Sequence, residues 1–137
     1  MKLNLSLVAF ASVALAQGAD IGLPTKGQTV PAGQDVIVQV QRVDTLTNSN
    51  ELAVAIGISS CAKGCLSAMK DMGTLLFNGT FEPAFHEAGP PPYQNYSVTI
   101  PSDFTKGAAQ INVAHATLVG ALLYPMIEGL NQSIIVT

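Results

Sequence analysis

The sequence lacks tryptophan and holds few charges, since only 11% of its residues are Asp, Glu, Lys or Arg. Six basic residues stand against nine acidic ones, so the formal net charge is −3, and the basic residues are scattered along the chain. Nucleic acids and anionic lipid surfaces are bound through clusters of positive charge, so both classes of partner are disfavoured.

The motifs of common catalytic sites are also absent: the chain has no G-x-S-x-G, no H-E-x-x-H and no phosphate-binding glycine loop. The oxygen-rich stretch 44–51 lacks the glycine and the spacing of a helix-loop-helix calcium site, and we interpret it as a solvated hairpin loop. We interpret His115, at the end of an expected strand, as a packed structural histidine. An enzyme would require His86, His115 and an acid or serine to converge. We therefore predict a non-enzymatic protein with no catalytic residues, no cofactor and no metal.

No apolar run approaches the roughly 20 residues that span a bilayer. The N-terminus has the pattern of a secretory signal peptide: Lys2, an apolar segment over 3–14, and the small-x-small triplet ending at Ala16. The alternative is a buried or amphipathic N-terminal helix. We predict that residues 1–16 are removed, and that residues 17–137 form a single domain. That domain is expected to be extracellular and monomeric, with no membrane span.

Two features fit a secreted chain. The sequons at Asn78, Asn95 and Asn131 predict N-glycosylation. The only cysteines, Cys61 and Cys65, lie in the stretch CAKGC, and pairing is the simplest state for two cysteines in an oxidising compartment. A redox site, half of a metal site and free thiols are the alternatives.

Period-2 alternation of apolar residues predicts about seven short strands, at 21–23, 35–43, 51–59, 75–77, 95–101, 108–114 and 133–137. In the third of these, Leu52, Val54, Ile56 and Ile58 are expected on one face. The other face, with Ala53, Ala55 and Gly57, is small enough for another surface to approach closely. Many short strands separated by turns indicate an all-β antiparallel sandwich.

The segment 79–94 departs from the strand pattern and carries Phe81, Phe85, His86 and Tyr93 among four prolines. Aromatic side chains on a proline-stiffened loop lose little entropy on binding, which suits a recognition surface. Phe85, His86 and Tyr93 are therefore our candidate partner-binding residues. The alternative, which we favour for Phe81 and Phe85, is that both phenylalanines pack into the core. Tyr93 is expected to be exposed.

The segments IGLPTKGQTVPAGQDVIVQV (21–40), ELAVAIGIS (51–59), MGTLLFNGTF (72–81), PPPYQNYSVTIP (90–101) and KGAAQINVAH (106–115) resemble the necrosis-inducing secreted proteins of fungi, a family of small secreted effectors. The resemblance implies an immunoglobulin-like sandwich and a role in virulence. It implies a host or fungal protein as partner, since some members suppress plant pattern-triggered immunity by binding receptor-associated kinases. It offers no catalytic residues to carry over.

The P-x-x-G-x-x-V-x-x-G opening also occurs in fungal cell-wall proteins, so a wall or carbohydrate-associated module that binds polysaccharide is the second hypothesis. Such a module is expected to expose a row of planar aromatics. The chain has three tyrosines and no tryptophan, and Tyr96 is expected to be buried because it alternates onto an apolar strand face.

Overall fold

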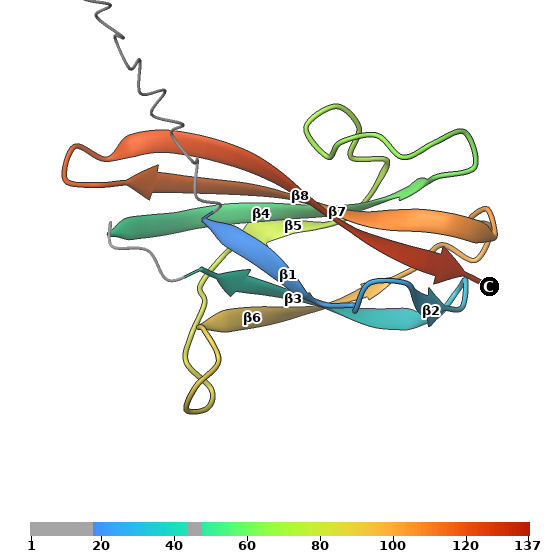
Figure 1. Cartoon of the computed structure of the whole chain (residues 1–137), viewed down its shortest axis with the longest axis horizontal. Coiled ribbons are helices and arrows are strands. Elements are labelled where there is room, and N and C mark those ends of the chain that lie inside the picture. The colour runs from blue at the N-terminus through green and yellow to red at the C-terminus, as the bar shows by residue number, and fades with distance from the viewer. Residues whose placement is uncertain (1–17, 44–47) are drawn as a thin grey trace, which may run out of the picture.

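The computed structural model describes residues 18–43 and 48–137, which form two β-sheets packed as a sandwich (Figure 1). The strands are β1 (Ala19–Leu23), β2 (Gln28–Val30), β3 (Asp35–Arg42), β4 (Ser49–Ser60), β5 (Thr74–Thr80), β6 (Tyr93–Thr99), β7 (Gly107–Val119) and β8 (Tyr124–Val136). The predicted all-β sandwich is confirmed. The predicted signal peptide, residues 1–16, lies outside the described residues, and so do residues 44–47 of the oxygen-rich stretch.

One sheet has three strands in the order β1-β3-β6, and the other has five in the order β2-β8-β7-β4-β5. Every neighbouring pair is antiparallel except β2 and β8, which run parallel. The long β7–β8 hairpin forms the centre of the larger sheet (Figure 1). In the part of the chain that the structure describes, no helix is long and apolar enough to cross a membrane.

The structure has eight strands in the described residues, and β2 is the one that the sequence did not predict. Its three residues are too few to display an alternation, and its partner is the end of the chain, where Gln28 pairs with Ile134 and Val30 with Val136. A strand of this kind is formed by pairing with a distant segment rather than by its own sequence.

The core lies between the sheets and is built from the alternating residues of both. Its most deeply buried members include Val38, Val40, Ile56, Ile58, Ile100, Ile111, Val113 and Ile134. Tyr96 is also buried, as its place in the alternation predicted. A buried polar side chain, His115, lies at one end of this core.

The expectation that Leu52 shares a face with Val54, Ile56 and Ile58 is wrong: those three side chains are buried, whereas that of Leu52 is 45% exposed. The register of β4 against β7 shifts between Glu51 and Ala53, where one strand carries an extra residue. A bulge of this kind reverses the facing of the residues on one side of it. As a result Glu51, rather than Leu52, points into the sandwich beside Thr117.

Candidate functional site

The segment between β5 and β6, residues 81–92, extends away from the sandwich at the end where β6 begins (Figure 1). We call it the projecting loop. It begins at Phe81, which is only 1% exposed and meets the His115 ring in a T-shaped arrangement, with ring centroids 5.3 Å apart. The prediction that Phe81 packs into the core is confirmed, and this ring anchors the loop to the sandwich.

Backbone hydrogen bonds close the base of the projecting loop. The Ala84 N–H donates to the Tyr93 carbonyl at 3.2 Å, and the Tyr93 N–H donates to the Ala84 carbonyl at 3.0 Å. The Glu82 N–H donates to Gln94 Oε1 at 2.8 Å. These bonds join the two arms of the loop into a short ladder, which limits the conformations open to its tip.

Two of the three candidate binding residues are in direct contact. The rings of His86 and Tyr93 stack with centroids 4.1 Å apart and planes 17° apart. The Tyr93 hydroxyl donates to Glu87 Oε1 at 3.1 Å. Desolvation of the phenol and this hydrogen bond both raise the pKa of Tyr93. Tyr93, which was expected to be exposed, is only half-exposed, and one face of its ring is covered by His86.

The third candidate, Phe85, is 69% exposed, so the expectation that it packs into the core is wrong. Phe81 already occupies the core position at the end of β5. By Ala84 the chain has entered the ladder with Tyr93, and Phe85 follows it toward the tip. The projecting loop thus presents an exposed aromatic ring at Phe85, which precedes the stacked His86 in the sequence.

A buried polar cluster lies beneath the projecting loop. His115 on β7 has a fully buried side chain, and both ring nitrogens meet carboxylates. Its Nδ1–H donates to Glu128 Oε1 on β8 at 2.8 Å, and its Nε2–H donates to Glu51 Oε2 on β4. The Ser49 hydroxyl donates to Glu51 at 2.6 Å, and the Gly18 N–H donates to Glu128 at 3.1 Å. We call this the His115 cluster.

The His115 cluster holds a charged imidazolium. Burial by itself would lower the pKa of His115, but the hydrogen bonds and charges of Glu128 and Glu51 raise it from 6.5 to about 9. Burial would likewise raise the pKa of Glu51, but its hydrogen bonds with His115 and Ser49 bring it below the usual 4.5. The prediction of a packed structural histidine is confirmed. The sequence did not indicate that Glu51 and Glu128 are its partners. Glu51 in particular points inward only because of the bulge in β4.

The His115 cluster contains a histidine and acids, as catalytic dyads do, but a substrate cannot reach its histidine. A general base must come within hydrogen-bond reach of its substrate, whereas His115 is 0% exposed and both nitrogens are occupied. The ring of the other histidine, His86, stacks on Tyr93 rather than joining the His115 cluster. Among residues 18–43 and 48–137, no three His, Cys, Asp or Glu side chains are grouped so as to hold a metal ion.

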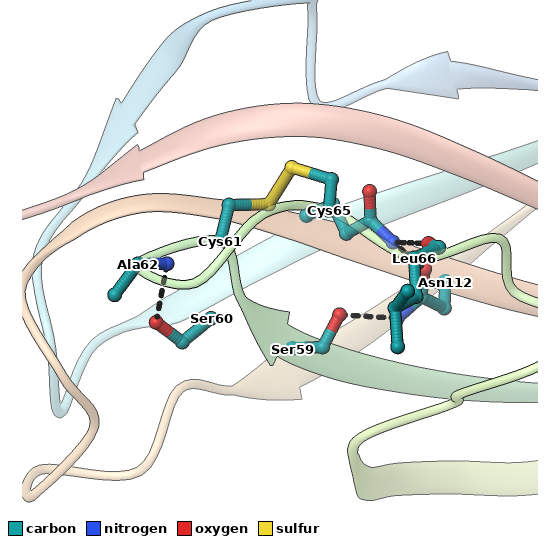
Figure 2. The surroundings of a disulfide bond; sticks show 8 residues. Ser59, Ser60, Cys61, Ala62, Cys65, Leu66 and Asn112 are labelled. Carbon is teal, nitrogen blue, oxygen red and sulfur yellow. Dashed lines mark hydrogen bonds between the residues drawn. A yellow bond between two sulfur atoms is a disulfide. The ribbon is translucent and has the colours of Figure 1, made fainter.

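Cys61 and Cys65 are joined in a disulfide with Cα atoms 4.6 Å apart, as expected (Figure 2). The bond lies at the start of a segment, residues 61–73, that we call the covering loop. In Figure 2 the Ala62 N–H of the loop donates to Ser60 Oγ at the end of β4, at 3.2 Å. Nearby, the Asn112 side chain on β7 donates to Ser59 Oγ on β4 at 2.9 Å.

The covering loop lies on the outer face of the five-stranded sheet. Gln110 and Asn112 on β7 point to this face, yet they are 1% and 0% exposed because the loop covers them. Their side-chain amides donate to the carbonyls of Leu66 and Met72 respectively. At Gly57 on β4 an added Cβ would overlap the Met72 carbonyl oxygen. The close approach predicted over the small face of this strand is therefore real at Gly57.

The three predicted glycosylation sites all lie on the surface. Asn78 on β5 and Asn131 on β8 belong to the five-stranded sheet, and Asn95 on β6 belongs to the three-stranded one. Each asparagine is exposed, so each is accessible to modification. Glycosylation itself stays a prediction.

Comparison with known proteins supplies a family and a fold. The Nis1 family matches residues 14–135 of this chain. No curated protein matches the chain significantly. A superoxide reductase (neelaredoxin) from Ignicoccus hospitalis is similar in structure, with a TM-score of 0.50, 11% identity, and coverage of 88% of this chain and 81% of that one. Fibronectin(III)-like modules of Clostridium thermocellum CbhA match with a TM-score of 0.42, 14% identity, and coverage of 87% and 45%. At 11% identity the likeness to the superoxide reductase shows the fold alone.

Proposed function

The chain belongs to the Nis1 family, and on this basis we propose that it is a secreted, effector-like protein that binds another protein through the projecting loop. Membership of the family suggests secretion and an effector-like role. The part of the proposal that concerns the surface rests on the geometry of the loop.

The observation that carries the proposal is the 69% exposure of Phe85 on a loop whose base is closed by hydrogen bonds. Exposed aromatic rings are frequent anchors of protein interfaces, because they bury a large apolar area in a pocket of the partner. The ladder at Ala84 and the stack of His86 on Tyr93 already order the surroundings of this ring. Little further entropy is then lost when a partner binds.

The charges on the projecting loop indicate the chemistry of the partner. Glu82 and Glu87 lie on either side of Phe85 in the sequence, and residues 81–92 include no Lys or Arg. A complementary surface has an apolar pocket with a basic rim. We propose a plant receptor-associated kinase as the partner, which is the class that the family resemblance implies.

A polysaccharide-binding wall module has less support. Sugar-binding surfaces need exposed, flat aromatic rings, whereas Tyr96 is buried and one face of Tyr93 is covered by His86. We also propose that the protein acts without catalysis. Both nitrogens of His115, the histidine that meets two acids, are withdrawn from substrate.

The experiment measures binding of the full secreted protein to the purified kinase domain of a plant receptor-associated kinase, with chitin and β-glucan as alternative baits. The test variant is Phe85→Ala. The control is Leu122→Ala, which removes an even more exposed apolar side chain, at 95%, from the β7–β8 turn. We expect Phe85→Ala to weaken binding to the kinase by about tenfold or more, and Leu122→Ala to leave it unchanged.

Equal affinities for the kinase in wild type and Phe85→Ala would remove the projecting loop from the proposed interface. Retention on chitin or β-glucan, with no binding to the kinase, would favour the wall module instead. Circular dichroism of each variant separates a lost contact from a lost fold.

A further inference from the structure

The covering loop covers only part of the outer face of the five-stranded sheet. It lies over Gly57 and Gly129, and Met69 comes so close that a Cβ at Gly129 would lie 2.8 Å from its Cγ. Another part of this face is a shallow groove of about 490 Å³. Its lining includes Ala53, Ala55, Asn78, Ala114, Ala116 and Ile127.

Four alanines make the floor of this groove, which we call the alanine groove. Across β4 and β7, Ala53 pairs with Ala116 and Ala55 pairs with Ala114. Residues paired in this way point to the same face of the sheet, and none of the four extends beyond its Cβ. The floor is therefore flat and apolar. Contact with another apolar group would remove this surface from water and stabilise the protein.

Asn78 stands at the border of the alanine groove. It lies on the edge strand β5 and pairs with Ala55, so its side chain points to the same face as the floor. Asn78, Ala55 and Ala114 form one row across three strands. At the usual spacing of strands, this row spans about 10 Å from the first Cα to the last. Asn78 is also the acceptor of the sequon that ends at Thr80.

We propose that Asn78 carries an N-linked glycan whose first N-acetylglucosamine lies in the alanine groove and shields it from water. This sugar has a ring face of C–H bonds and an acetamido methyl group, and both gain by contact with alanine methyls. Its hydroxyls are left facing solvent. The alanines of the floor, Asn78 and Ile127 are all uncharged, which fits an uncharged sugar.

The position of the sequon decides between a glycan and a macromolecule as the occupant. A glycan at Asn78 is bulky and solvated, and it stands beside the alanine groove on the same face. It would block the approach of a second copy of the chain or of another protein. The same residue, Asn78, would therefore both exclude a protein partner from the groove and supply the sugar that fills it.

The experiment uses the full chain secreted from a glycosylating yeast, and it begins with mass spectrometry of the peptide that contains Asn78. We expect this residue to be glycosylated, and an unmodified Asn78 would overturn the proposal. The key variants are Thr80→Ala, which destroys the sequon, and Thr80→Ser, which preserves it. Both leave Asn78 in place. Ser97→Ala, which removes the Asn95 sequon on the opposite sheet, is the control for loss of any glycan.

We expect Thr80→Ala to lower the melting temperature by about 2–6 °C and to increase binding of an apolar fluorescent dye. Thr80→Ser and Ser97→Ala are expected to behave as wild type. Trimming by an endoglycosidase that leaves a single N-acetylglucosamine should preserve the wild-type melting temperature, because the first sugar makes the contact. Equal changes in Thr80→Ala and Ser97→Ala would overturn the proposal.

A direct measurement covers the case in which Thr80→Ala folds poorly. In the trimmed wild-type protein, nuclear Overhauser effects are expected between the acetamido methyl group and the methyls of Ala55 or Ala114. Their absence at an occupied Asn78 would show that the sugar extends into solvent. Neither measurement involves the projecting loop, so the result is independent of partner binding.

Discussion

Glu128→Gln is expected to weaken the dependence of the protein's stability on alkaline pH. Glu128 accepts hydrogen bonds from His115 Nδ1 and from the backbone N–H of Gly18. Glutamine has nearly the same shape, but its single oxygen can accept from only one of these two donors. It also removes a negative charge that helps to hold the proton of His115. The substitution therefore changes the charge of the His115 cluster with little change in its packing.

The direction of the effect follows from the raised pKa of His115, about 9 in the folded protein against 6.5 ordinarily. The folded state binds this proton more tightly than the unfolded state does. The cluster therefore stabilises the fold fully below pH 6.5, and this stabilisation is lost as the pH rises to about 9. At acid pH the lowered pKa of Glu51 acts in the opposite sense, and its contribution is lost as the pH falls through the folded-state pKa of Glu51, which lies below 4.5.

The magnitude follows from the same two pKa values. A shift from 6.5 to about 9 corresponds to at most about 3 kcal/mol. Glu128 is 14% exposed, so solvent screens part of its interaction and we expect about 2 kcal/mol. The charge of Arg42 also helps to lower the pKa of Glu51.

Urea unfolding followed by circular dichroism at about pH 6 and about pH 9.5 measures this effect. Wild type is expected to lose about 2 kcal/mol of unfolding free energy between these pH values, and Glu128→Gln about half of that. Glu87→Gln, which removes an exposed carboxylate from the projecting loop, is the control and should keep the wild-type slope. A wild-type slope in Glu128→Gln would refute the assignment of the pH dependence to the His115 cluster.

Three further predictions concern stability in the same assay. Replacing Cys61 and Cys65 together by serine should lower the unfolding free energy by about 2 kcal/mol, since the disulfide closes a short loop; an unchanged value would mean that the bond constrains little in the unfolded chain. Gly57→Ala should lose about 1–3 kcal/mol, because the new methyl overlaps the Met72 carbonyl; a neutral result would show that the covering loop yields easily. Phe81→Ala should lose about 3–5 kcal/mol, as expected for a fully buried ring; a loss below about 1 kcal/mol would contradict its role as the anchor of the projecting loop.

The alternation of side chains along β3, β6 and β7 is a local property, and it predicted the core residues of these strands correctly. Val38, Val40, Tyr96 and Ile111 are all buried as expected. The pattern failed at Leu52, because a bulge arises from the pairing of two strands and leaves no mark in the sequence of either one. The same bulge brought Glu51 to His115, so the sequence could not predict the partners of that histidine.

For the candidate binding residues, too, the sequence predicted some features and the tertiary structure decided others. The sequence placed Phe85, His86 and Tyr93 on a proline-stiffened segment. The structure places Phe85 and His86 in the projecting loop and Tyr93 at the start of β6. The sequence did not predict the exposure of Phe85, because this exposure depends on Phe81 occupying the core position instead. The stack of His86 on Tyr93 depends on the ladder that brings the two arms of the loop together.

The sequence by itself determined the class of fold, the sequons and the pairing of two cysteines that are close along the chain, because each depends on residues within a short window. Only the tertiary structure decided the strand order, the parallel pairing of β2 with β8, the His115 cluster and the division of the outer sheet face between the covering loop and the alanine groove. These features join segments far apart in the chain, and their geometry depends on strand register, which no single segment encodes.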